Sequence, residues 1–235
     1  MEFERKKIII TGGSSGIGKA TAKRLTDLGA NVLITGRSKK RLEKAADQIG
    51  CAWIESDVSK QEEVNKVFDW VLKNWSNQVD VLINNAGLGE FASVEETPME
   101  SYYRVFGVNT FGPIMMVKKV LPFMKEQKSG SIINIGSTSS IKGFANGSSY
   151  SASKFALRGF TQSLMEEVRP FNIRVFQINP SEVTTALGNP EREERKEIEF
   201  KLGPEQLAQT IVSVLMLPEK AFIPELSVWA TNPRN

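Results

Sequence analysis

The chain has no histidine and only one cysteine, Cys51, among its 235 residues. A lone cysteine excludes an internal disulfide and a thiolate zinc site, and it is typical of a reducing compartment. Without histidine, the commonest metal ligand and the usual acid–base group near neutral pH are both missing. We therefore expect no metal site, and any proton transfer must use other side chains.

The sequence also lacks an excess of one charge and long apolar runs. Its 30 lysines and arginines are scattered among 27 acids, a formal net charge of +3, so no basic stripe is available to a nucleic acid. The N-terminal stretch MEFERKKIII has too few apolar residues for a signal peptide, and no run reaches membrane-spanning length. We expect a cytoplasmic protein with neither nucleic acid nor membrane among its partners.

What is present is an alternation of short apolar runs with longer amphipathic patterns, which is typical of a parallel sheet. The runs are almost continuously hydrophobic, as expected of strands buried on both faces. No repeat or linker divides the chain. We predict a single α/β domain over residues 1–235, a Rossmann-type doubly wound parallel sheet of about seven strands with helices on both faces. The predicted strands are KKIIIT (6–11), NVLIT (31–35), AWIES (52–56), VDVLIN (79–84), GSIINIG (130–136), IRVFQIN (173–179) and LSVWA (226–230).

Helix ends are marked by short local signals. Two capping boxes led by serine or threonine predict helix starts, and two glycines predict helix ends. These signals are, in chain order, Gly29, Gly50, the pair Ser59 and Glu62, and the group Thr97, Pro98 and Glu100.

A glycine-rich turn follows the first predicted strand. The segment TGGSSGIGKA, residues 11–20, has glycines at positions 12, 16 and 18. Glycines at this spacing let the backbone turn tightly and approach a pyrophosphate, which the amides and dipole of the following helix would bind. A tight connection between strand and helix is the simpler alternative for this turn alone.

Further motifs are spread along the chain. NNAG occupies residues 84–87, Asn109 and Ser137 follow, and YSASK occupies residues 150–154. With the glycine-rich turn, their order and spacing resemble the short-chain dehydrogenase/reductase family over residues 6 to about 185. The resemblance implies hydride transfer between a nicotinamide cofactor and a carbonyl or secondary alcohol. It does not identify the substrate, because one fold serves many activities.

Tyr150 and Lys154 are four residues apart, so on a helix they share a face. We predict that the Lys154 ammonium lowers the tyrosine pKa from its usual value of about 10. Tyr150 would then protonate a carbonyl oxygen while Ser137 donates a second hydrogen bond, as the resemblance implies. A solvent-facing pair is the alternative for this spacing alone. The predicted catalytic residues are Asn109, Ser137, Tyr150 and Lys154.

Asn109 lies inside a helical pattern, four residues before Pro113. Proline lacks the amide that would bond the Asn109 carbonyl, so this carbonyl is predicted to be free. The resemblance implies that it holds a water molecule in contact with Lys154, on a proton route to Tyr150. A tolerated, exposed polar residue is the alternative.

The resemblance also implies a dinucleotide along the carboxyl ends of the strands. Asp57 is interpreted as an adenine contact, because Ser59 and Glu62 already supply the helix cap; a structural role is the alternative. NPSEVTT, residues 179–185, is similar to the family's PGxVxT segment, which fixes the nicotinamide carboxamide, although Ser181 replaces its glycine. The predicted cofactor-binding residues are Gly12, Ser14, Ser15, Gly16, Ile17, Gly18, Arg37, Ser38, Asp57, Val58, Asn85, Ala86, Gly87, Tyr150, Lys154, Pro180, Val183 and Thr185.

Cofactor preference is predicted from LITGRSKKR, residues 33–41. Where an NAD enzyme places an acid, this chain has Gly36 followed by Arg37 and Ser38. Arginine suits a 2′-phosphate, so we expect NADP(H) to be preferred over NAD(H); an exposed cation at a helix start is the alternative. Ser15 departs from the family pattern, because many NADP-using relatives carry a basic residue there.

We therefore predict an enzyme that reduces a ketone, aldehyde or 3-oxoacyl group. A 3-oxoacyl-(acyl-carrier-protein) reductase, a 3-hydroxy acid dehydrogenase and a catalytically silent NADP-binding sensor are the alternatives. Residues 187–203 are predicted to form a substrate lid with Leu187, Ile198 and Phe200 facing inward, or else a solvated surface helix. A partly apolar pocket for a small-molecule carbonyl or alcohol is predicted from Leu88, Phe91, Ile141, Phe144 and Leu187.

The family resemblance also implies a homodimer or homotetramer that assembles through the helix of Tyr150. Core packing competes for the apolar positions of this helix. Those predicted to contribute to the contact are Phe155, Phe160, Leu164 and Val168.

Overall fold

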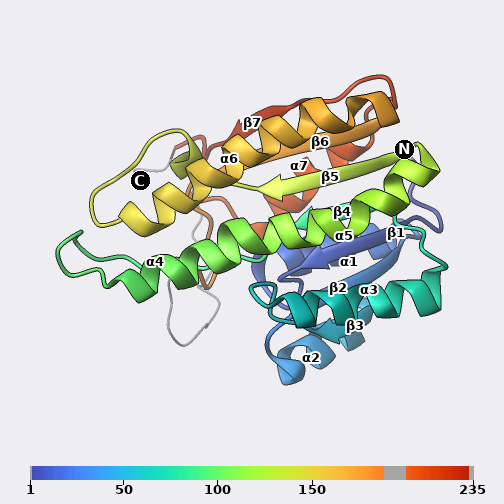
Figure 1. Ribbon diagram of the computed structural model, residues 1–235, viewed down its shortest axis with the longest axis horizontal. Helices are drawn as coiled ribbons and strands as arrows, with labels where there is room; N and C mark the ends of the chain where they lie inside the picture. Colours follow the sequence, from blue (N-terminus) through green and yellow to red (C-terminus); the bar gives the residue numbers. More distant parts are fainter. Residues whose placement is uncertain (1, 188–199, 233–235) are drawn as a thin grey trace.

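The computed structural model describes residues 2–187 and 200–232, and its centre is one parallel sheet (Figure 1). The sheet has seven strands in the order β3-β2-β1-β4-β5-β6-β7, and every neighbouring pair is parallel. The predicted doubly wound sheet is confirmed. The strands are β1 (Lys7–Thr11), β2 (Asn31–Gly36), β3 (Ala52–Glu55), β4 (Val81–Asn84), β5 (Gly130–Ile135), β6 (Ile173–Pro180) and β7 (Glu225–Val228).

The strand order reverses at the centre of the sheet. From β1 the chain first adds β2 and β3 on one side, then returns to add β4 to β7 on the other. In such a sheet the connections after the two central strands diverge, which leaves a crevice at their carboxyl ends. Figure 1 shows all strands pointing one way, with α4 and the start of α6 projecting beyond this edge.

Helices cover both faces of the sheet. One face carries α1 (Gly16–Asp27), α2 (Lys39–Ile49) and α7 (Pro204–Leu215). The opposite face carries α3 (Gln61–Trp75), α5 (Gly112–Gln127) and α6 (Ser148–Val168). The remaining helical segments are α4 (Met99–Phe106), the π-helical turn η1 (Gly107–Phe111) and the 3₁₀ turns η2 (Thr138–Ser140) and η3 (Arg169–Phe171).

Alternation along each strand divides the core into two layers. In β1, Ile8 and Ile10 pack under α1, α2 and α7, whereas Ile9 packs under α3, α5 and α6. All three isoleucines are fully buried. A strand covered on both faces needs apolar side chains at every position, which explains the continuous hydrophobic runs of the sequence.

The glycine signals for helix ends are confirmed. Gly29 follows the end of α1 with φ +86°, and Gly50 caps α2 with φ +78°. Both angles lie in the left-handed region, where a side chain is strained and glycine is not.

The two predicted capping boxes are wrong. Helix α3 begins at Gln61, and the Ser59 hydroxyl donates to the Asp57 carboxylate at 2.7 Å instead of capping the helix. Helix α4 begins at Met99, and the Thr97 hydroxyl donates back to the Ser93 carbonyl at 2.7 Å. In both places, a short polar side chain bonds a nearer group in its own turn, the usual competitor of a helix cap.

The apolar residues predicted for an oligomer contact divide between core and surface. Leu164 and Val168 are buried under the sheet, so they are wrong as surface contacts. Phe155 is 43% exposed, and Phe160 is half-buried against the same core cluster. In the described part of the chain, no helix has the length and apolar character needed to cross a membrane.

Candidate active site

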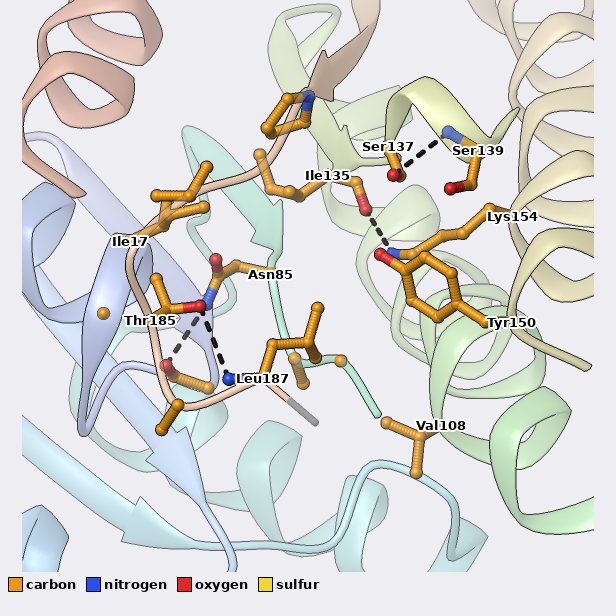
Figure 2. A pocket seen from close by; sticks show the side chains of 18 of the residues that line it. Ile17, Asn85, Val108, Ile135, Ser137, Ser139, Tyr150, Lys154, Thr185 and Leu187 are labelled. Carbon is orange, nitrogen blue, oxygen red and sulfur yellow. Dashed lines mark hydrogen bonds between the residues drawn. The ribbon is translucent and has the colours of Figure 1, made fainter. Parts of the chain in front are cut away.

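A cavity of about 1250 Å³ opens along the carboxyl edge of the sheet. Its lining comes from the ends of all seven strands and the segments that follow them, together with the start of α6. Figure 2 shows Ile17 and Asn85 on one side of it and Ser137, Tyr150 and Lys154 on the other. Every predicted catalytic or cofactor-binding residue lines this cavity except Gly18 and Asn109.

The glycine-rich turn has the backbone geometry predicted for a phosphate cradle. Gly12 and Gly16 have φ of +67° and +51°, and a Cβ at Gly12 would lie 2.9 Å from the Cα of Ala86. A Cβ at Gly18 would overlap the Gly12 carbonyl, so Gly18 serves packing of the turn. Ser15 is the N-cap of α1 without a side-chain bond to the helix, which leaves this helix start suited to a pyrophosphate.

Asn85 fastens this turn to the end of β4. Its side-chain amide donates to the carbonyls of Thr11 and Gly12, at 2.9 and 3.2 Å. In return, the Thr11 hydroxyl accepts from the backbone amides of Asn85 and Ala86, each at 3.0 Å. Thr11 is therefore a positioning residue that sequence reasoning missed, although it opens the glycine-rich motif.

Asp57 lines the cavity but also has a local structural role. Its carboxylate accepts from the amide and the hydroxyl of Ser59, and its own amide donates to Glu63 at 2.7 Å. The prediction that Ser59 caps α3, which would leave Asp57 free for the cofactor, is wrong, since Ser59 bonds Asp57 and does not cap α3. A contact of Asp57 with adenine remains a prediction.

The end of β2 presents cations to the cavity. Arg37, Ser38 and Arg41 line it, and Ser38 is the N-cap of α2. Sequence reasoning missed Arg41, which lies in the first turn of α2 and belongs to the same motif as Arg37. A second cavity of about 450 Å³ adjoins Arg37 and is lined by acids as well as cations, among them Glu55 and Lys60.

Tyr150 and Lys154 lie in the first two turns of α6 and are 6% and 4% exposed. The Lys154 Nζ donates to the Ile135 carbonyl at 2.8 Å and lies 5.8 Å from the centre of the tyrosine ring. Burial lowers the pKa of Lys154 to about 8. Burial also raises the pKa of the Tyr150 hydroxyl, and a hydrogen bond with Ser137 acts in the opposite direction.

The predicted lowering of the tyrosine pKa is therefore wrong for the protein chain alone. Helical spacing correctly brings Tyr150 and Lys154 together, but it does not report how deeply they are buried. Burial penalises the charged form of both groups, so phenol and amine are each pushed toward neutrality.

Ser137 stands at the N-cap of the 3₁₀ turn η2. Its hydroxyl accepts from the Ser139 amide at 3.1 Å, and its own amide donates to the Ser140 hydroxyl at 3.2 Å. Because the Ser137 hydroxyl accepts the hydrogen bond from the Ser139 amide, it is held at the wall of the cavity that Tyr150 also lines.

A buried polar network supports this serine turn from below. Gln177 donates to the Ser140 hydroxyl at 3.4 Å and to Asn179 at 3.0 Å. Asn179 donates to Glu225 at 2.8 Å, and Glu225 pairs with Arg158 at 2.9 Å. Sequence reasoning missed this network. Its signal was the presence of two amide side chains, Gln177 and Asn179, in a strand that is buried along its whole length.

Asn109 lies in the π-helical turn η1 and is fully buried. Its side chain exchanges two hydrogen bonds of 2.8 Å with the backbone of Leu88 and donates to the Ser153 hydroxyl at 3.0 Å. The side chain thus joins the loop after β4 to α6. The exposed alternative is excluded. Pro113 lies in the first turn of α5, four residues after Asn109. A water molecule bound to the Asn109 backbone carbonyl remains a prediction.

The segment after β6 closes one side of the cavity. Val183 and Thr185 line it, and Leu187 donates its amide to the Thr185 hydroxyl at 3.4 Å. Leu202 returns alongside and forms a parallel bridge with Val183. Most of the predicted lid, including Ile198, lies outside the described residues; Leu187 lines the cavity, and Phe200 is 41% exposed.

The apolar part of the cavity matches the predicted substrate pocket with one exception. Phe91, Ile141, Phe144 and Leu187 line it. Leu88 does not line the cavity; its backbone amide and carbonyl are bonded to the Asn109 side chain. Trp229 also lines the cavity, and sequence reasoning placed it in a strand without a role at the site.

Comparison with known proteins identifies the group to which this arrangement belongs. Residues 6–196 match the family described as short chain dehydrogenase. The chain belongs to the short-chain dehydrogenase/reductase family. An uncharacterized oxidoreductase of Staphylococcus saprophyticus is 34% identical over 97% of this chain and 98% of its own. Carbonyl reductase family member 4 of Xenopus laevis is 35% identical over 91% of this chain and 92% of its own.

Solved structures of the short-chain dehydrogenase/reductase family agree with this assignment. The alcohol dehydrogenase from the archaeon Thermococcus sibiricus complexed with 5-hydroxy-NADP has a TM-score of 0.90 and 30% identity, covering 99% of both chains. A serine dehydrogenase complexed with NADP+ has a TM-score of 0.86 and 28% identity, covering 94% of this chain and 93% of that one. The protein is therefore an oxidoreductase of this family.

Proposed function

We propose that this short-chain dehydrogenase/reductase transfers hydride between NADP(H) and a carbonyl or secondary alcohol substrate. The observation that carries the proposal is that the buried Tyr150 lines the same cavity as Ser137 and the glycine-rich turn. A proton donor, a second hydrogen-bond donor and a dinucleotide cradle share one enclosed space. Carbonyl reduction needs these three elements together.

The lining residues fit an extended dinucleotide. The turn of Gly12 to Ile17 would hold the pyrophosphate, Asp57 and Val58 the adenine, and Asn85 to Gly87 its ribose. Lys154 would bind the ribose nearer the reacting ring, and the segment from Pro180 to Thr185 its carboxamide. When bound, the nicotinamide supplies or accepts the hydride.

In reduction, the substrate carbonyl oxygen accepts hydrogen bonds from Tyr150 and Ser137. As the carbonyl carbon accepts a hydride, the Tyr150 hydroxyl would give its proton to the oxygen, so that the carbonyl would become an alcohol. Its raised pKa keeps Tyr150 protonated at neutral pH, the form that an acid requires. Lys154 can return a proton to the tyrosine, because its pKa of about 8 lies near the working range.

Preference for NADP(H) is supported by the cations after β2. Arg37 and Arg41 both line the cavity at the point where the chain has Gly36 instead of an acid. Three similar solved structures are complexes with NADP or a derivative of it: the archaeal alcohol dehydrogenase, a serine dehydrogenase and a metagenomic short-chain oxidoreductase. The planar, charged guanidinium can donate two hydrogen bonds to the oxygens of a phosphate, so it suits a 2′-phosphate better than a hydroxyl.

The test is Tyr150→Phe, assayed by NADPH oxidation against a panel of ketones and aldehydes. We expect turnover to fall at least a hundredfold, within the usual range for an acid–base group, with NADPH affinity nearly unchanged because the ring still packs. Leu72→Ala, which removes an exposed apolar side chain on α3, is the control. Turnover near that of the unmutated enzyme would refute the assignment of Tyr150.

A 3-hydroxy acid dehydrogenase is the second candidate. It is favoured by the likeness to two serine dehydrogenases, with TM-scores of 0.86 and 0.82. NADP+ reduction by serine or 3-hydroxybutyrate at a rate above that of neutral alcohols would select it. A silent NADP-binding sensor would bind the cofactor and turn over no member of either panel.

A further inference from the structure

Two phenylalanines form one side of the cavity beside the reactive tyrosine; we refer to Phe91 and Phe144 as the aromatic wall. The ring of Phe91 meets that of Tyr150 edge-on, with centroids 5.7 Å apart and an interplanar angle of 68°. The ring of Phe144 continues the row, 5.9 Å from Phe91 and tilted by 49°. The aromatic wall therefore begins at the proton donor and extends outward.

Two glycines make room for these rings. A Cβ at Gly89 would approach the Phe91 ring to 2.7 Å, and a Cβ at Gly147 would overlap the Phe144 ring. Gly147 has φ −118°, which any residue can adopt, so backbone conformation does not require glycine there. What a larger residue would disturb is the position of the Phe144 ring over the start of α6.

The rings keep apolar surface open to the cavity instead of filling the core. Phe91 and Phe144 are 47% and 49% exposed, and the neighbouring Ile141 is 47% exposed, while Tyr150 is 6% exposed. All four line the cavity. The interaction energy between aromatic rings is most favourable when the second ring packs in a tilted or offset arrangement.

Among the residues that the structure describes, the charged groups on this side of the cavity do not offer a matched site for a zwitterion. Glu182 is paired with Lys201 at 2.7 Å, and Lys142 follows Ile141 on the exposed turn. A free amino acid would need its carboxylate and its ammonium both bound, at a high desolvation cost beside two phenyl rings.

We propose that the substrates are uncharged ketones or aldehydes with a flat aromatic or conjugated group next to the carbonyl. The flat group would pack on Phe91 and Phe144 while the carbonyl oxygen reaches Tyr150 and Ser137. This inference rests on the proposed function, since it specifies the substrate class of the same site.

The test compares acetophenone with cyclohexyl methyl ketone, which has the same ring size without aromaticity. Conjugation also changes the intrinsic reactivity of a ketone, so the decisive quantity is the ratio of the two kcat/KM values in each variant. We expect Phe144→Leu, which stays apolar but loses the ring, to reduce the ratio of acetophenone to cyclohexyl methyl ketone about fivefold, the value of one aromatic contact.

Gly147→Ala tests the same wall with both rings retained. Because alanine suits the backbone at this position, we expect it to displace the Phe144 ring and to reduce the ratio in the same direction as Phe144→Leu. Leu72→Ala on α3 should leave the ratio unchanged. Thermal unfolding of each variant checks that the fold is retained, which the half-exposed position of Phe144 favours.

The outcomes separate the substrate class from the proposed function. A ratio that is the same in the unmutated enzyme, Phe144→Leu and Gly147→Ala would overturn the aromatic substrate class, as would turnover of pentan-2-one but not of acetophenone. Either result would leave the carbonyl reductase itself intact. Absence of NADPH oxidation with every neutral carbonyl would instead overturn the proposed function, and the substrate class with it.

Discussion

Lys154 combines a buried position with a lowered pKa. In the unfolded chain its pKa is the ordinary 10.5, whereas burial lowers it to about 8 in the folded chain. Between these values the unfolded state binds more protons than the folded state, so the free energy of unfolding rises with pH. Below pH 8 both states are protonated, and the full cost of burying the ammonium is present.

We therefore expect the stability of the unmutated protein relative to Lys154→Met to increase from pH 8 to pH 10. The increase should approach about 1.4 kcal/mol per pH unit at its steepest. Urea unfolding of both proteins without cofactor, at several pH values, measures the difference.

Other buried groups do not disturb this comparison. Burial raises the pKa of Cys51 to about 11, and its contribution is the same in both proteins. Tyr150, whose pKa is raised above its usual value of 10.0, stays protonated in this window. Parallel pH dependences for the unmutated protein and Lys154→Met would show that Lys154 keeps its ordinary pKa.

Arg37 lines the cavity and is the residue expected to bind the 2′-phosphate of NADPH. We expect Arg37→Ala to remove most of a preference for NADPH over NADH, because a charged hydrogen bond contributes about 1.5–3 kcal/mol, roughly tenfold to a hundredfold in affinity. Lys39→Ala is the control, since Lys39 begins the same helix but does not line the cavity. Fluorescence titration of both cofactors provides the affinities. Equal affinities in the unmutated protein would contradict NADP selectivity.

At the scale of elements, strands were predictable and helix starts were not. The strands follow from burial on both faces, which demands a continuous apolar run such as that of β1. Helix starts depend on which of several nearby groups a hydroxyl bonds. Ser59 bonds Asp57, and Thr97 bonds Ser93, so a pattern of residue types was insufficient.

The sequence predicted most of the residues that line the site, but it did not predict the pKa shifts of Tyr150 and Lys154. Residues four apart on α6, and loops at one edge of a parallel sheet, are brought together by geometry that the sequence implies. Burial is set by the whole fold, so the shifts in the pKa of Tyr150 and Lys154 could not follow from spacing. The π-helical turn that lets Asn109 bond Leu88 has no signal in the sequence beyond the nearby Pro113.

At the scale of the whole molecule, we expect a homodimer or homotetramer. The reason is the apolar surface near α6: Phe155 is 43% exposed, and Phe111 and Tyr103 on the adjoining η1 and α4 are 55% and 69% exposed. Light scattering at micromolar concentration measures the mass. Phe155→Glu should shift the population toward smaller species, whereas Leu72→Glu on α3 should not. A monomeric unmutated protein would exclude the assembly.

The central position of β1 has a consequence for how the protein reaches its folded state. Ile8 in β1 pairs with Val81 in β4, so this contact joins segments that are distant in the chain. Such contacts form slowly during folding, because closing the long loop between them costs conformational entropy. The glycine-rich turn lies between β1 and β4 in the chain, whereas Ser137 and Tyr150 follow β4. Neither half of the chain contains a complete site, so the appearance of activity during refolding reports the joining of the two halves, not the formation of either one.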